Sequence, residues 1–108
     1  MPEIAPLAFP FEHNRFRHEL VERQGDVCLV RRLNLEVDPP SAHWEVVILQ
    51  RRRAETLPSG RSYPAREAYP GDAEWGTHGW TFVIEALARA KWAEITLRSS
   101  GAAPQSPG

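Results

Sequence analysis

The fold is decided by the stretch Trp75-Gly76-Thr77-His78-Gly79-Trp80-Thr81-Phe82. It places three large aromatic side chains and two glycines within eight residues, directly before an amphipathic segment. Aromatic side chains are costly to leave in water, and glycine permits backbone angles that other residues avoid. The stretch therefore predicts a loop with a fixed path, in which the unusual angles of both glycines let Trp75 and Trp80 turn to opposite sides. The loop is either a lid on the core or a binding surface, and its place before the helix favours the structural role.

The hydrophobic period changes after this loop. From Val83 to Leu97 the apolar side chains recur at helical spacing, and the helix former alanine is frequent. Thr81 is the expected N-cap, and Ser99-Ser100-Gly101 ends the helix. The face expected to turn inward consists of Ile84, Leu87, Ala88, Trp92 and Ile95. The sequence predicts a structural aromatic cluster of Trp75, Trp80, Phe82 and Trp92, in which Trp80, Phe82 and Trp92 pack together where helix meets sheet.

Upstream of the loop the sequence has the period-2 pattern of β-strands. The predicted strands are Phe16–Arg23, Val27–Leu35 and Trp44–Gln50. Gln24-Gly25-Asp26 is typical of a turn. The second strand ends at Val37-Asp38-Pro39-Pro40-Ser41, because two prolines do not fit a central strand. The third strand is apolar on both faces, as expected for an inner strand covered on both sides. A fourth short strand around Arg61–Ala65 would follow a turn at Pro58-Ser59-Gly60.

Together these elements predict an α+β fold. It is a three- to four-stranded antiparallel meander with one C-terminal helix packed on one face. The length of 108 residues fits one domain. We expect a proline-rich N-terminal arm at 1–14, tied down by Phe9 and Phe11, a domain at 15–98 and a disordered tail at 99–108.

Composition excludes several classes of function. The formal net charge is −1, which argues against strong non-specific attraction to nucleic acid. No apolar run approaches the roughly 18 residues of a membrane span. The N-terminus lacks the basic and apolar segments of a signal peptide. The single cysteine, Cys28, cannot form an intramolecular disulfide and fits a reducing compartment. We therefore expect a cytoplasmic protein with no membrane partner.

Arginine is concentrated between residues 31 and 66, close to the two tyrosines. Arginines beside aromatic rings on a sheet can bind single-stranded nucleic acid. Alternatively, they form a solvated strand edge that resists aggregation, or pair with Glu67, Asp72, Glu74 and Glu85. The near-neutral net charge favours this second interpretation. The candidate binding surface is Arg31, Arg32, Arg51, Arg52, Arg53, Arg61, Tyr63, Arg66 and Tyr69.

The histidines are scattered and show no metal-site spacing. They are His13, His18, His43 and His78. His78 lies between the two glycines, and we interpret it as a turn residue bonded to nearby backbone. Cys28 lies within a predicted strand, as is typical of an inert buried thiol. The sequence thus predicts no catalytic residue, no metal ligand and no cofactor.

A motif in the second half resembles a group of small uncharacterised proteins of bacteria and their phages. The motif is a W-G-x-x-G-W-[TA]-F segment that leads into an A-x-x-K-[FW] helix. The matching residues are Tyr69, Pro70, Trp75, Gly76, Gly79, Trp80, Thr81, Phe82, Ala88, Lys91 and Trp92. Pro64-Ala65-Arg66-Glu67 also resembles a segment of that group, so the similarity covers roughly 43–95. It departs from the pattern at Val83-Ile84. The resemblance implies a bacterial or mobile-element setting and no particular activity.

Three classes of function follow. The first is a small non-enzymatic binding protein whose partner is another protein; in a phage or mobile-element setting that partner is a host protein. The second is single-stranded nucleic-acid binding through the arginine-rich sheet edge. The third, ranked last, is a small nuclease-like enzyme that uses histidine and arginine. The sequence leaves the identity of the partner and the oligomeric state open.

Overall fold

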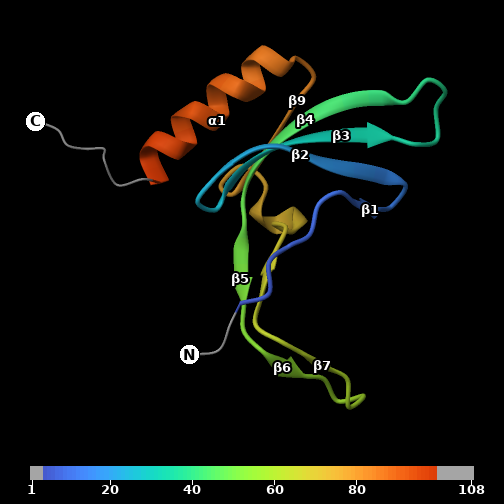
Figure 1. Ribbon diagram of the computed structural model, residues 1–108, viewed down its shortest axis with the longest axis vertical. Coiled ribbons are helices and arrows are strands. Elements are labelled where there is room, and N and C mark those ends of the chain that lie inside the picture. The colour runs from blue at the N-terminus through green and yellow to red at the C-terminus, as the bar shows by residue number, and fades with distance from the viewer. Residues whose placement is uncertain (1–3, 100–108) are drawn as a thin grey trace, which may run out of the picture.

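Residues 4–99 are described by a computed structural model (Figure 1). It confirms the α+β fold, with one C-terminal helix on one face of an antiparallel sheet. The sheet has five strands in the order β1-β2-β3-β4-β9, more than the three or four predicted. Their bounds are β1 Phe11–His13, β2 Phe16–Gln24, β3 Val27–Asn34, β4 Ser41–Ile48 and β9 Gly79–Phe82. The predicted meander corresponds to β2, β3 and β4.

The fifth strand, β9, lies inside the aromatic stretch that we predicted to be a loop. Its Trp80 pairs with Val46 of β4, and its Thr81 pairs with Glu45. β9 has only four residues, so the alternation of apolar and polar side chains along it is too short to be recognised in the sequence. Thr81 therefore belongs to a strand and is not the N-cap that we expected.

The helix α1, Glu85–Ser99, covers one face of the sheet, here called the helix face. Ala88 and Ile95 are buried against Val27, Leu29 and Val46. Around them pack the partly buried side chains of Val21, Trp44, Ile48, Trp80, Phe82 and Trp92. Among residues 4–99, no helix combines the length and the apolar character needed to cross a membrane.

Two of the five side chains that we expected to turn inward do not. Ile84 is 57% exposed and Leu87 is 54% exposed. Ile84 precedes the helix, which begins at Glu85. The buried stripe runs through Ala88, Trp92 and Ile95, and Leu87 lies about 100° around the helix from Ala88. The apolar pattern was therefore wider than the face that the sheet covers.

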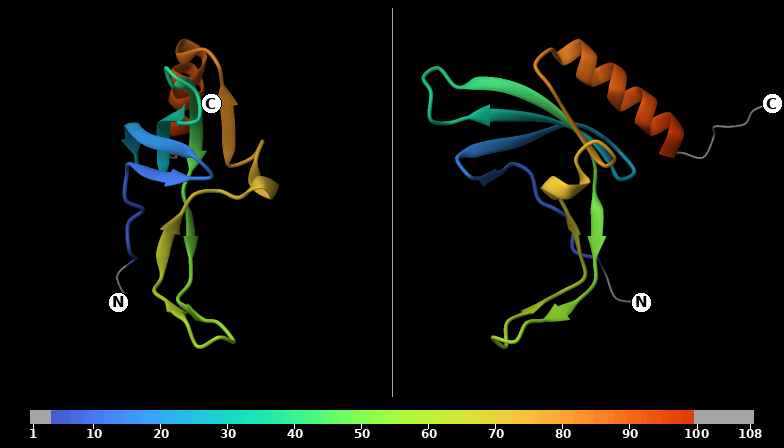
Figure 2. Two further views of the ribbon diagram at one scale, coloured as in Figure 1. Left: turned by 90° about the vertical axis from the view of Figure 1, so that its right-hand side faces the viewer. Right: turned by 180° about the vertical axis from the view of Figure 1, so that it is seen from behind.

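The predicted strand Trp44–Gln50 is interrupted at Leu49. After this residue the chain leaves the sheet and forms an arm that projects from the body (Figures 1 and 2). In the arm, β5 (Gln50–Arg52) pairs with β8 (Arg66–Ala68), and β6 (Glu55–Thr56) pairs with β7 (Ser62–Tyr63). The short strand expected around Arg61–Ala65 thus exists as β7, but it pairs within the arm and not with the main sheet.

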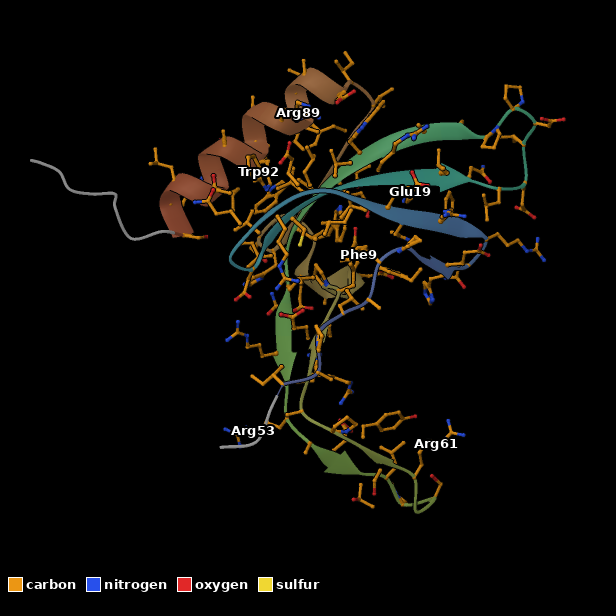
Figure 3. All side chains as sticks on the ribbon, viewed as in Figure 1. Phe9, Glu19, Arg53, Arg61, Arg89 and Trp92 are labelled. Carbon is orange, nitrogen blue, oxygen red and sulfur yellow. The ribbon has the colours of Figure 1, made fainter. Side chains whose placement is uncertain are left out.

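The opposite face of the sheet, here called the pocket face, has a second core. Cys28, Val30, Val47 and Leu49 are buried there. They are covered by side chains from two other segments: Leu7 and Phe9 from the N-terminal segment, and Tyr69 and Trp75 from the segment after the arm. Figure 3 shows Phe9 across the sheet from Trp92 of the helix. Residues 100–108, most of the predicted tail, lie outside the described residues.

Candidate functional site

Strand register brings polar side chains side by side on the pocket face. His18 of β2 pairs with Arg32 of β3, which in turn pairs with His43 of β4. In the neighbouring row, Glu45 of β4 pairs with Thr81 of β9. Facing partners in an antiparallel sheet project to the same side. The rows therefore form a polar region beside the apolar core of Cys28 and its neighbours.

Glu45 is the centre of this region and is only 3% exposed. The Tyr69 hydroxyl donates to Glu45 Oε1 at 2.5 Å. Arg32 Nη1 donates to Glu45 Oε2 at 3.1 Å, and the Thr81 hydroxyl donates to the same oxygen at 3.5 Å. Trp75 Nε1 donates to Thr81 Oγ1 at 3.1 Å. A buried carboxylate is tolerated when such partners surround it.

His18 lies between two aromatic rings at the edge of this network. Its ring stacks on Phe11 at 4.5 Å and meets Tyr69 edge to face at 5.2 Å. Burial lowers the pKa of His18 below its ordinary value, and Glu45 only partly opposes the shift. Arg32 lowers the pKa of His18 further. His18 is therefore a neutral imidazole near pH 7, and its Nδ1 has no hydrogen-bond partner among the described residues.

A cavity of about 680 Å³ opens over these side chains. Its polar walls include His18, Arg32, Glu45 and Thr81. Its aromatic walls are Phe11, Phe16, Tyr69 and Trp75, and its further lining residues include Glu12, His13, Asn14 and Asp72. A volume of this size with mixed aromatic and polar walls is typical of a small-ligand site.

The arginine surface predicted from sequence is dispersed in the structure. Arg32 alone reaches the cavity, whereas Arg53 and Arg61 lie out on the arm (Figure 3). Five of the seven arginines are in ion pairs. The pairs are Arg31–Glu19, Arg32–Glu45, Arg51–Asp26, Arg52–Glu74 and Arg66–Glu55. These seven side chains therefore do not form one continuous patch.

The two tyrosines of the predicted surface are also separated. Tyr63 lies on the arm, where the Arg66 guanidinium carbon is 5.1 Å from its ring centroid. Tyr69 is in the cavity wall and donates to Glu45. Burial, reinforced by Glu45, raises the pKa of Tyr69 far above its ordinary value, so this hydroxyl does not ionise.

The aromatic cluster is divided between the two faces of the sheet. Trp80, Phe82 and Trp92 pack on the helix face, whereas Trp75 packs on the pocket face. Gly76 has a φ of +96°, as expected for a glycine in the left-handed region. Our explanation for Gly79 was wrong, because its φ is not positive. A Cβ at Gly79 would lie 2.5 Å from the Trp75 ring, so this position lacks a side chain to admit the indole.

Cys28 lies deep under the second core and does not reach the cavity. Burial raises the pKa of its thiol to about 11, so the reactive thiolate is rare at neutral pH. Within residues 4–99, no group of three or more histidine, cysteine or acidic side chains is placed to hold a metal ion. His78 lies at the turn before β9, where its ring contacts the Thr77 hydroxyl.

Sequence reasoning missed His18, Glu45 and Thr81 as members of one site. One signal was available, because Glu45 is a carboxylate inside the most apolar strand of the chain. A buried carboxylate needs partners, and this need predicts a polar cluster. The partners themselves come from β3, β9 and the segment after the arm, so only the tertiary fold identifies them.

Comparison with known protein families, with curated proteins and with solved structures gives no match in any of the three.

Proposed function

We propose that this chain is a small non-enzymatic binding protein whose ligand enters the cavity of the pocket face. One observation carries the proposal. A buried, hydrogen-bonded polar network lies in the wall of an aromatic cavity of about 680 Å³. Networks of this kind cost stability in a chain that has only a modest core, so retaining one at a cavity wall is typical of a recognition site.

The chemistry of the cavity supports binding more than catalysis. Tyr69 does not ionise, and both oxygens of Glu45 are already hydrogen-bonded. The Nδ1 atom of His18 has no hydrogen-bond partner within residues 4–99, so no carboxylate or nucleophile is bonded to it. General acid–base catalysis needs a titratable group within hydrogen-bond reach of the reacting atom or of an activated nucleophile. What the network provides is a rigid, pre-organised wall.

The partner that we propose is another protein, one of whose terminal or side-chain groups fills the cavity. Five ion-paired arginines leave little free positive charge for a nucleic-acid backbone. The resemblance of the Trp-Gly-x-x-Gly-Trp segment to small bacterial and phage proteins is the basis for proposing a host protein in a mobile-element setting. That part of the proposal is analogy.

The test is to fill the cavity from one of its walls. Thr81→Tyr enlarges an exposed strand residue in the cavity wall. Because Thr81→Tyr also changes the hydroxyl that bonds Glu45 and Trp75, its thermal unfolding curve must first show that it folds. Thr56→Tyr makes the same change at an exposed strand residue of the arm. With the immobilised protein as bait in bacterial lysate, we expect Thr56→Tyr to retain the captured partner and Thr81→Tyr to lose it. Equal capture by both folded variants would refute the proposed site.

A nuclease-like enzyme is the second candidate, and one observation favours it. His13 and His18 both line the cavity that holds Arg32, so a phosphate bound by the arginine would lie near two imidazoles. Cleavage of single-stranded RNA by the purified protein, abolished by His18→Gln, would establish this function. Under the binding proposal the RNA remains intact, and anisotropy of a labelled strand at low salt stays flat.

A further inference from the structure

The polar network leaves nitrogen atoms unpaired at the cavity wall. Both oxygens of Glu45 are occupied, one by Tyr69 and the other by Arg32 and Thr81. Arg32 uses Nη1 for this contact, and its Nε is buried without a hydrogen bond among the described residues. His18 Nδ1 is likewise unpartnered, although His18 is only 6% exposed. Arg32 Nε–H thus lacks an acceptor, and His18 Nδ1 lacks a hydrogen-bond partner of either kind.

Unpaired buried polar atoms are uncommon in folded proteins, and they destabilise the fold. Three occur together in one row of the sheet, since His43 Nδ1, next to Arg32, is also without a partner in the described part of the chain. Of these three residues, His18 and Arg32 line the cavity. The Arg32 side chain is the one that a ligand oxygen can approach, because a quarter of it (25%) is exposed.

The remaining walls define the rest of the ligand. Phe11, Phe16 and Trp75 offer aromatic surface. The Arg32 guanidinium carbon lies 4.5 Å from the ring centroid of Phe16. This cation–π contact holds the guanidinium against an apolar wall. A ligand that matches both the arginine and the aromatic walls has an oxyanion at one end and an apolar or aromatic body at the other.

We propose that the cavity binds a carboxylate attached to an aromatic or apolar body, with the carboxylate at Arg32 beside His18. The inference rests on the proposed function for the location of the site and adds the chemistry of the ligand. The planar arginine fork matches a carboxylate in geometry and charge. The carboxylate can belong to a free small molecule or to the C-terminus of a partner protein.

The sign of the charge is tested with three ligands of one shape. Benzoate, benzamide and benzamidine are negative, neutral and positive. Isothermal titration at low salt should give benzoate binding about tenfold tighter than benzamide, since hydrogen bonds to a charged group are stronger. Benzamidine should be weakest. Equal affinities, an order that favours benzamidine, or no binding of benzoate would overturn the inference.

Two variants test where in the cavity the carboxylate of the ligand binds. Arg32→Lys keeps a cation for Glu45 but removes the fork, and should weaken benzoate about tenfold while the thermal unfolding curve shows that the variant folds. Asp72 is an exposed carboxylate of the cavity lining with no ion pair among the described residues. Asp72→Asn should tighten benzoate about twofold, because a like charge in the cavity lining is removed.

Asp38→Asn is the matched control, since Asp38 is an exposed carboxylate outside the cavity wall. It should leave benzoate affinity unchanged. Unaltered affinity in Arg32→Lys, or the same twofold gain in Asp38→Asn as in Asp72→Asn, would contradict the placement.

The source of the carboxylate is tested with a pentapeptide that ends in phenylalanine. Binding that is lost when the peptide C-terminus is amidated indicates a protein terminus, whereas benzoate binding without peptide binding indicates a small molecule. The experiments distinguish a wrong binding site from a wrong ligand chemistry. If benzoate does not bind and Thr81→Tyr still loses the captured partner, the ligand chemistry is wrong and the site is right.

Discussion

At the scale of single residues, Gly79 determines where Trp75 lies. The indole occupies the space that a side chain at Gly79 would fill. From there Trp75 reaches Thr81 and packs against the second core. One absent methyl group therefore positions a wall of the cavity.

We predict that Gly79→Ala destabilises the protein by about 1–3 kcal/mol, because the added carbon overlaps the Trp75 ring. Gly71→Ala is the control, since its Cβ would meet only a side-chain oxygen of Glu74 at 3.7 Å. That change should stay within about 0.5 kcal/mol. Urea denaturation gives both values, and near-UV circular dichroism reports the Trp75 environment. Equal stability of the two variants would show that Trp75 does not need this space.

His18 makes stability depend on pH. Burial holds its pKa in the folded protein below the ordinary 6.5, so the unfolded chain takes up the proton first as pH falls. Above the pKa of the unfolded chain, the neutral His18 ring costs the folded protein nothing. As pH drops from there toward the lower pKa of the folded protein, the unfolded chain binds the proton and stability is lost. Glu45 opposes this shift, while Arg32 and His13 add to it.

We therefore predict that the free energy of unfolding of the native protein falls as pH drops from about 7 to 5. His18→Phe keeps an aromatic ring beside Phe11 and removes the titration, so its profile should be flatter over this window. Urea denaturation at a series of pH values measures both profiles. Parallel profiles would mean that His18 is not buried in the neutral form.

At the scale of elements, α1 is held by a narrow stripe. Ile95 is 1% exposed, whereas Leu87, on the same helix, is 54% exposed. We predict that Ile95→Ala costs about 3 kcal/mol and that Leu87→Ala costs less than about 0.5 kcal/mol. Thermal or urea unfolding distinguishes them. A comparable loss in both variants would mean that the outer side of α1 is also buried in solution.

The elements also show which local signals the sequence contains. β2, β3 and β4 are long enough for their alternation to be read, and the turn around Gly25 and the two prolines separate them. The bend at Leu49 and the short strands β1 and β9 lack such signals. They exist because β2 and β4, the outer strands of the meander, offer pairing edges, and an edge is a property of the folded sheet.

At the scale of the whole molecule, the candidate site depends on register more than on sequence pattern. The meander places Arg32 between His18 and His43, while β9 and the segment after the arm add Thr81 and Tyr69. In a sequence, polar residues at every second position of a strand predict a face exposed to solvent. Only the return of the chain over the pocket face turns these positions into a cavity wall, which is why the candidate surface taken from the sequence was the arginine-rich one.

The central claim is that the pocket face, and not the arginine-rich segment, binds the partner. The most direct measurement is the amount of partner captured by two variants relative to the native chain. One is Thr81→Tyr, and the other is the triple variant Arg51→Ala, Arg52→Ala and Arg53→Ala. We predict that Thr81→Tyr loses the partner and that the triple variant retains it. Retention by Thr81→Tyr with loss in the folded triple variant would contradict the account.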